Sequence, residues 1–332
     1  MGGESTDRRR DSFLMSTTIK APPGTLVSGL HEWPSHIYRE IPADNWSTIK
    51  QFKDQSPEEA KHAIDNPDTE NEALAFGRAF HHYIGERDTF DDVYAPVPAL
   101  PHGGGHQRKT ASTSKDEGAE NKAILTDWKA KLKGREIIER ENYEKIVNMH
   151  AKMKAHPIIG PIVSGTMQTR NELVVLAEVE GHWRKALIDV ELKLSNTEAA
   201  ALFDPQGICP KDTYPGGTYI VDWKTTSAGV GRGTTRDTWG YSAAAWSYHG
   251  QAAWYTSVYY RATGVVPNFV FVPVRKAPPH SCAIYRVTDA QLRRGVSLYE
   301  SLLRVKHDCE KSRSYPGHTE THMPDMELAG WA

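Results

Sequence analysis

The stretch Tyr219-Ile-Val-Asp-Trp-Lys-Thr-Thr226 decides how this chain is interpreted. An apolar run with the composition of a β-strand ends in Asp222, and Lys224 follows two residues later. Because successive side chains of a strand point to opposite faces, we expect Asp222 and Lys224 to lie on the same face near the end of the strand. Taken alone, these two residues fit an ordinary surface ion pair equally well.

A second apolar run, Lys185-Ala-Leu-Ile-Asp189, ends in another carboxylate. If the two strands pair, Asp189 lies alongside Asp222. Two carboxylates and an ammonium group that converge on one point are best balanced by a divalent cation held between carboxylate oxygens. Lys224 is then free to hold a water molecule or a phosphate oxygen. The pattern favours metal-dependent cleavage of phosphodiester bonds.

A polar pair follows downstream in Tyr248-His-Gly-Gln-Ala-Ala-Trp-Tyr255. Gln251 and Tyr255 are four residues apart, so they share one face of a helix. We assign Gln251 to the catalytic group, where it contacts the attacking water or the scissile phosphate. Tyr248 and Tyr255 are weaker candidates for contact with DNA, because an ordinary amphipathic helix explains them as well.

Composition limits the class of protein without identifying it. Hydrophobic residues make up 39% and charged residues 25% of 332 residues, which is ordinary for a soluble globular protein. The net charge of −2 neither indicates nor excludes a nucleic-acid binder, since a basic groove can coexist with an acidic remainder. Cys209, Cys282 and Cys309 form no CxxC pair, which argues against a disulfide framework and favours the cytoplasm. No apolar run approaches the ~20 residues that span a bilayer.

The order of the expected elements predicts a single α/β domain over residues 37–313. Residues 1–36 are expected to be a disordered or irregular leader, 37–160 a helical N-terminal part, 170–313 the catalytic sheet with its helices, and 314–332 a loose tail. The expected helices cover 45–52, 56–64, 72–84, 122–133, 139–156, 243–261 and 289–309. The expected strands form an antiparallel pair within 173–190, with its turn at Glu180-Gly181, and cover 219–224, 268–274 and 283–287. Residues 195–217 are a polar insertion.

Six short motifs in this order resemble the PD-(D/E)XK nuclease superfamily, and more narrowly the exonuclease VIII group, the RecE nuclease domain of phages and prophages. The quoted stretches at 185–189, 219–226 and 248–255 carry the resemblance, together with Trp46-Ser-Thr-Ile-Lys50 and Ser56-Pro57, Ala75-Phe-Gly-Arg-Ala-Phe-His81, and the end of the chain from Tyr299 to Gly317. The likeness covers about residues 38–318. Three departures are the length of the 195–217 insertion, Leu187 in place of an arginine, and His318 in place of a tyrosine.

The resemblance implies a restriction-endonuclease-like core: a central mixed β-sheet flanked by helices, with a helical N-terminal elaboration. It also implies a first shell for Mg²⁺, with Mn²⁺ as a substitute, formed by His81, Asp189, Asp222 and the Trp223 carbonyl. His82 adjoins His81, and spacing alone does not choose between them. Glu178 or Glu180 would add an outer carboxylate, although a solvated hairpin explains both better.

The same resemblance implies an exodeoxyribonuclease that degrades linear double-stranded DNA from 5′ to 3′ and leaves 3′ overhangs for recombination. DNA ends are the expected substrate, a RecT-like annealing protein the expected partner, and a homo-oligomeric ring the expected assembly. Arg108 and Lys109 in a basic loop and Arg232 in a glycine-rich loop are candidate phosphate contacts. Two alternatives stay open: a RecB-like single-strand or structure-specific nuclease without strict polarity, and an inactive DNA-binding or assembly module.

Overall fold

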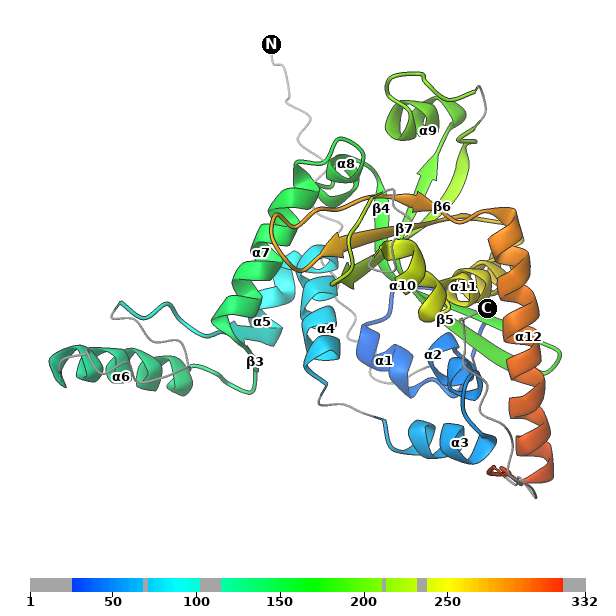
Figure 1. Ribbon diagram of the computed structural model, residues 1–332, viewed down its shortest axis with the longest axis horizontal. Helices are drawn as coiled ribbons and strands as arrows, with labels where there is room; N and C mark the ends of the chain where they lie inside the picture. Colours follow the sequence, from blue (N-terminus) through cyan, green and yellow to red (C-terminus); the bar gives the residue numbers. More distant parts are fainter. Residues whose placement is uncertain (1–25, 68–70, 102–114, 211–212, 232–237, 319–332) are drawn as a thin grey trace, which may run out of the picture.

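The sheet that holds the Asp222 strand is the centre of the molecule (Figure 1). The computed structural model describes residues 26–67, 71–101, 115–210, 213–231 and 238–318. Within them, six strands pair in the order β1-β4-β5-β6-β7-β8, and all pairs are antiparallel except β6 with β7. The strands are β1 (Gly29–His31), β4 (Thr169–Val179), β5 (His182–Leu194), β6 (Gly217–Thr226), β7 (Asn268–Arg275) and β8 (Tyr285–Arg286). The mixed central sheet is therefore the predicted one.

Helices cover both faces of this sheet. The helices of the described residues are α1 (Ser35–Glu40), α2 (Trp46–Ile49), α3 (Pro57–Asp65), α4 (Glu72–Gly85), α5 (Phe90–Val93), α6 (Lys115–Ala130), α7 (Arg140–Lys154), α8 (Ile159–Val163), α9 (Asn196–Phe203), α10 (Trp239–Ala245), α11 (Tyr248–Thr263) and α12 (Asp289–Ser312), with short 3-10 turns at Lys50–Phe52 and Arg87–Thr89. Of these, α6 extends away from the sheet (Figure 1). A separate parallel pair joins β2 (Tyr94–Pro96) to β3 (Glu136–Ile138). The predicted α/β class is confirmed.

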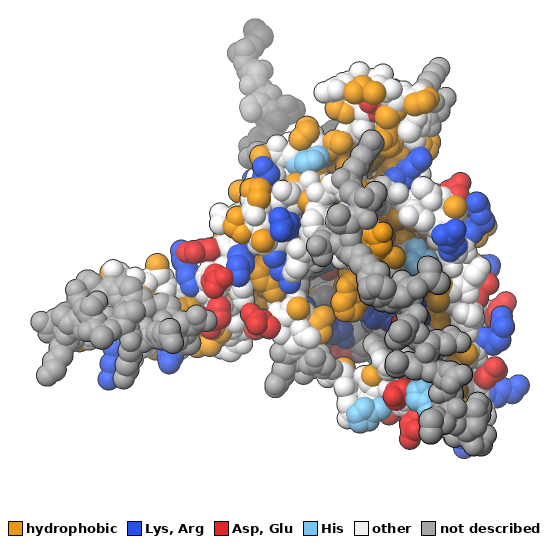
Figure 2. Space-filling model, in the orientation of Figure 1, with side chains coloured by type: hydrophobic (Ala, Val, Ile, Leu, Met, Phe, Trp, Pro, Cys, Tyr) orange, Lys and Arg blue, Asp and Glu red, His pale blue; other side chains and the backbone are white. Residues whose placement is uncertain are grey.

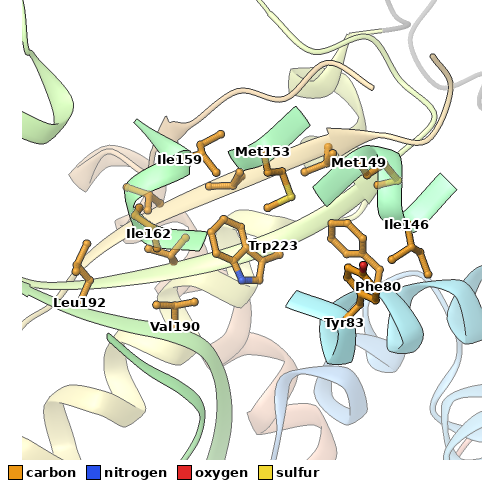
Figure 3. Close-up of a cluster of buried hydrophobic side chains, with 14 of the residues drawn as sticks. Phe80, Tyr83, Ile146, Met149, Met153, Ile159, Ile162, Val190, Leu192 and Trp223 are labelled. Atoms are coloured by element: carbon orange, nitrogen blue, oxygen red, sulfur yellow. The ribbon is translucent and has the colours of Figure 1, made fainter. Parts of the chain in front are cut away.

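Two apolar cores lie on opposite faces of the sheet. One face packs against α4, α7, α8 and α9, and Trp223 lies in this core among Met153, Ile162 and Val190 (Figure 3). The other face packs against α2, α3, α11 and α12, with Trp254 at its centre. Burial of a large side chain of this kind contributes about 1.5–3 kcal/mol relative to exposure. β6 is thus fixed from both sides.

Local signals set the ends of several helices as the sequence predicts. Ser56 caps α3 through a capping box with Glu59, and Pro57 occupies the first helical position. The β4–β5 hairpin turns at Glu180 and Gly181, both of which have positive φ. A left-handed backbone at two successive residues is what a tight two-residue hairpin requires.

The predicted helix over 243–261 is wrong, because the structure has two helices, α10 and α11, with a break at Ser247. Ser247 has φ 54°, in the left-handed region, and redirects the chain. This change of chain direction packs Gly250 against the ring of Trp46. A Cβ atom added to Gly250 would lie 2.3 Å from a carbon of that ring. Tertiary packing overrides the helix propensity of the Ala-rich sequence here.

Several other segments contain more structure than expected. Residues 26–36 are not irregular, because β1 pairs with β4 at the edge of the sheet and α1 begins at Ser35. The insertion 195–217 contains α9, whose Ser195–Glu198 capping box was visible in the sequence. The helix expected from residue 122 begins at Lys115. Residues 314–318 contact α3, where Glu58 N–H donates to the Pro316 carbonyl at 3.3 Å. None of the described helices combines the length and apolarity that crossing a membrane requires.

Candidate active site

Asp222 and Lys224 lie together on the α11 side of β6, as the alternation of the strand predicts. The Lys224 ammonium forms an ion pair with Asp222 Oδ1, and the Asp222 side chain is only 2% exposed. Lys224 Nζ also lies 5.1 Å from the centroid of the Tyr248 ring and 5.8 Å from that of Phe271. A buried ion pair between aromatic rings is unlike a surface pair, because solvent does not screen it.

Asp189 reaches the same place because β5 and β6 stop pairing there. Their ladder ends at Val190 opposite Val221. Asp189 Oδ2 instead accepts a hydrogen bond of 2.8 Å from the Trp223 N–H. At the point where the strands separate, the Asp189 side chain thus accepts the hydrogen bond that a backbone carbonyl would accept in a continuous ladder. The site is therefore built at the end of a ladder, where side chains of two strands can converge.

The pairing of β5 with β4 is irregular as well. Glu172 of β4 has a φ of 48°, in the left-handed region. Glu172 and Asp189 would face each other in the β4–β5 ladder, but they do not pair. Ile188 belongs to the core beneath α11, whereas Val190 belongs to the core beneath α7. Regular alternation would place these two residues on one face. The strand therefore changes face at Asp189, which brings that carboxylate to the opening between the layers.

His81 of α4 approaches Asp189 from the other layer. His81 Nδ1 lies 3.3 Å from Asp189 Oδ1. His82 points elsewhere: its Nε2 lies 3.0 Å from Thr89 Oγ1, and its ring contacts Tyr94 edge-on. The structure thus brings His81, and not His82, to the carboxylates.

Glu172 is the site residue that sequence reasoning missed. One ligand atom each from His81, Glu172 and Asp189 lie within 4.8 Å of one another. The outer carboxylates considered in its place, Glu178 and Glu180, are exposed on the hairpin. Glu172 stands directly before the apolar run Leu173-Val-Val-Leu176, so its position at the start of a strand was the available signal. Nothing in that position foretold its left-handed backbone.

The electrostatics of the cluster show an excess of negative charge. Burial, with the nearby Asp189 carboxylate, raises the pKa of Glu172 to about 8. Burial also raises the pKa of Asp222 to about 6, with Lys224 acting in the opposite direction. Burial disfavours the charged form of His81, yet the Asp189 carboxylate outweighs it and raises the His81 pKa to about 9. Glu172 therefore holds a proton near neutral pH unless a further cation offsets its charge.

Gln251 completes the group from α11. Gln251 Nε2 donates a hydrogen bond of 2.8 Å to Asp222 Oδ2, and the side chain is 8% exposed. Asp222 Oδ1 is buried and accepts no hydrogen bond; its contact is the Lys224 ammonium. Tyr255, one turn further along α11, packs edge-on against Phe269 in the core. Tyr248 lines the opening of the site, so it is the better placed of the two tyrosines.

A hollow of about 800 Å³ leads to these side chains. His81, Glu172, Asp189, Lys224 and Tyr248 line it. Two arginines that sequence reasoning did not select, Arg39 and Arg78, line it as well. Arg108, Lys109 and Arg232 lie outside the described residues. The lining of the hollow is therefore mixed in charge, and its Arg78 forms an ion pair with Glu136 at 3.3 Å.

The donor set fits a hard divalent cation. Asp189 and Glu172 offer carboxylate oxygens and His81 offers a ring nitrogen close together. The Asp222 carboxylate lies nearby, with its oxygens contacted by the Lys224 ammonium and the Gln251 amide. Oxygen-rich sites of this kind suit Mg²⁺ and Mn²⁺. Trp223 places its backbone beside Asp189 and its side chain in the core (Figure 3), so its carbonyl is available as a candidate further ligand.

Part of the chain matches a known family. Residues 209–322 match the model of a family described as a PDDEXK-like domain of unknown function. The matched region contains Asp222, Lys224 and Gln251, whereas His81, Glu172 and Asp189 precede it. A search of curated proteins finds no match to this chain.

A solved structure shares the architecture. It is the crystal structure of a "Putative exonuclease" from Eubacterium rectale, with 13% sequence identity and a TM-score of 0.50. The likeness covers 90% of this chain and 97% of that one. This chain therefore shares its fold with that structure, and its residues 209–322 resemble a PDDEXK-like domain.

Proposed function

We propose that this protein is a divalent-metal-dependent exodeoxyribonuclease that acts on the ends of linear double-stranded DNA. The observation that carries the proposal is the convergence of Asp189, Asp222 and Lys224 with His81 and Glu172 at the separated ends of β5 and β6. Removal of nucleotides from 5′ to 3′, which leaves 3′ overhangs for recombination, is supported by the motif resemblance alone. A ring-shaped homo-oligomer and a RecT-like annealing partner belong to the same proposal.

The residues of the site would have different roles in the proposed reaction. His81, Glu172, Asp189 and Asp222 would hold Mg²⁺, which lowers the pKa of bound water and offsets charge on the phosphate. Burial lowers the pKa of Lys224, yet the Asp222 and Asp189 carboxylates outweigh it and the net shift is upward. Lys224 would orient a water or phosphate oxygen, help to deprotonate that water, or stabilise developing negative charge. Gln251 holds the Asp222 carboxylate in place.

Contacts with the rest of the substrate would come from the walls of the hollow. Arg39, Arg78 and Tyr248 stand where a phosphate backbone would pass. The face drawn in Figure 2 carries Lys and Arg interspersed with Asp and Glu, in keeping with the net charge of −2. Binding would thus depend on a few local cations, and should weaken with rising salt.

The decisive experiment uses linear duplex DNA labelled at its 5′ or 3′ end, with Mg²⁺ or EDTA. Wild-type protein should release nucleotides from the 5′ end with Mg²⁺ and none with EDTA. Asp222→Asn should be inactive, while Glu178→Gln, which changes an exposed carboxylate on the hairpin, should match wild type. Absence of cleavage with any divalent metal would favour the DNA-binding module instead.

A second substrate separates the nuclease alternatives. On a duplex whose ends are blocked, an exonuclease stalls, whereas a structure-specific or single-strand nuclease of the RecB-like kind still cuts at a gap or flap. Cleavage that survives in Asp222→Asn would mean that the catalytic assignment is wrong.

A further inference from the structure

A second cluster of metal-ligating side chains lies at the other end of β5. Asp44 precedes α2, His182 is the first residue of β5, and His307 lies in the second half of α12. One ligand atom from each lies within 4.8 Å of the others. Figure 1 shows the β4–β5 hairpin reaching the side of α12, which is how three distant segments meet.

The ligand atoms of this cluster lie close together. His307 Nε2 lies 3.0 Å from Asp44 Oδ2. The rings of His182 and His307 stack with their centroids 4.1 Å apart and an interplanar angle of 15°. Stacking holds the two imidazoles face to face beside the same carboxylate, and the exposed His182 ring would turn to direct a nitrogen at a shared ion. No hydrogen bond between His182 and another side chain competes for its ring nitrogens among the contacts of the described residues.

Hydrogen bonds and an ion pair hold Asp44 in a fixed position. Its N–H donates to the Trp183 carbonyl at 2.8 Å, and its carbonyl accepts from the Lys185 N–H at 2.8 Å. Lys306 Nζ holds Asp44 Oδ1 at 2.8 Å, which leaves Oδ2 directed at the histidines. A carboxylate held through one oxygen while the other faces the ion is the usual supporting arrangement of a metal ligand. Asp44 is only 8% exposed.

This cluster is separate from the candidate active site. His182 and Asp189 are seven residues apart on one strand, which corresponds to about 23 Å. Its chemistry also differs. Two imidazole nitrogens and one carboxylate oxygen suit borderline ions such as Zn²⁺ or Co²⁺, whereas an oxygen-rich set suits Mg²⁺.

We propose that Asp44, His182 and His307 form a structural site for a transition-metal ion of the Zn²⁺ class, with solvent as a further ligand. The ion would join the N-terminal segment, the β4–β5 hairpin and α12. These three segments are brought together only by tertiary packing, so an ion that binds only the folded state stabilises the fold. The proposal is independent of the nuclease assignment.

The test measures Zn²⁺ binding to metal-free protein in the presence of millimolar Mg²⁺, by calorimetry and by thermal unfolding. Wild-type protein should bind Zn²⁺ at this site and show a higher Tm with the ion. His182→Ala should lose one equivalent of bound Zn²⁺ or weaken its binding at least 100-fold. His62→Ala, which removes an exposed histidine of α3, is the matched control and should bind like wild type. Asp222→Asn should keep this equivalent, which separates the two sites.

Lys306→Met distinguishes an ion site from a simple hydrogen-bonded network. Removing the ammonium should lower the Tm of the metal-free protein, because Asp44 loses its partner. It should also enlarge the rise in Tm that Zn²⁺ produces, because a competing positive charge is gone. Equal Zn²⁺ binding by wild type, His182→Ala and His307→Ala would overturn the proposal. So would a wild-type protein that binds no Zn²⁺ at micromolar concentration.

Discussion

The two ends of β5 carry clusters built from similar side chains that differ in charge. At the Asp189 end, Glu172 and Asp222 join Asp189, and His81 with Lys224 supplies the positive charge. At the His182 end, Asp44 faces two histidines and Lys306. The first cluster has more carboxylates than cations, whereas the second has one carboxylate with an ion-pair partner already in place. The first therefore suits a hard divalent cation, whereas the second, with two imidazoles and one carboxylate, suits a borderline ion.

The largest expected effect in this comparison is the loss of DNA cleavage on substitution of Lys224. Lys224→Met should lower the rate of DNA cleavage on the order of 10²–10³-fold, because a charge that stabilises the transition state is lost. The Mg²⁺ concentration at half-maximal rate should stay the same or fall, since the competing ammonium is gone. Initial rates over a Mg²⁺ titration measure both. A raised Mg²⁺ requirement with an unchanged maximal rate would contradict the role given to Lys224.

Glu172→Gln tests the residue that sequence reasoning missed. If Glu172 supports the ion at the Asp189 end, the Mg²⁺ requirement should rise about 10–100-fold, and saturating Mg²⁺ should restore most of the rate. The Zn²⁺-induced rise in Tm from the His182 end should be unaffected. A Mg²⁺ titration of Glu172→Gln beside Glu178→Gln provides the comparison. Identical titrations would remove Glu172 from the site.

His81 and His82 are neighbours that the structure assigns to different places. His81→Ala should reduce cleavage about 10–100-fold with little loss of stability, since its partner is the Asp189 carboxylate. His82→Ala should leave cleavage near wild type and lower the free energy of unfolding by about 1 kcal/mol, through loss of the Thr89 contact. Paired activity and denaturant-unfolding measurements separate them. A loss of cleavage in His82→Ala but not in His81→Ala would assign the site to His82 instead.

The smallest expected effect is a pH dependence of stability at the Asp189 end. The pKa values of Glu172 and Asp222 are raised to about 8 and about 6, so the folded state binds these protons more tightly than the unfolded state. His81, raised from 6.5 to about 9, stabilises the fold below its unfolded pKa and loses that contribution as pH rises through 9. Asp222 exerts its effect below about pH 6, whereas Glu172 and His81 act above it, so metal-free protein should lose stability from pH 6 to pH 9.

Thermal unfolding in EDTA across this range measures the effect. Added Mg²⁺ should reduce the decline, because the ion binds the deprotonated carboxylates. Glu172→Gln should reduce it in the absence of metal as well. A metal-free Tm that rises steadily with pH would contradict the charge balance described for this cluster.

Much of the fold could be predicted because its signals are local. The alternation in 173–190 predicted the β4–β5 hairpin, and the capping residues at Ser56 predicted where α3 begins. By contrast, β1 has three residues and depends on its partner β4, so composition does not reveal it. The break at Ser247 depends on the packing of Gly250 against Trp46, which is likewise not local.

The sequence by itself determined which residue types stand at the ends of which strands. Asp189, Asp222 and Lys224 follow from apolar runs and the period of two, and the motif order led to the PD-(D/E)XK-like fold. Only the tertiary structure decided that β5 changes face at Asp189, that Glu172 joins the cluster, and that His81 is the histidine that reaches it. The physical reason is that backbone irregularity and contacts between layers depend on residues far apart in the chain, whereas propensity and periodicity act within a few residues.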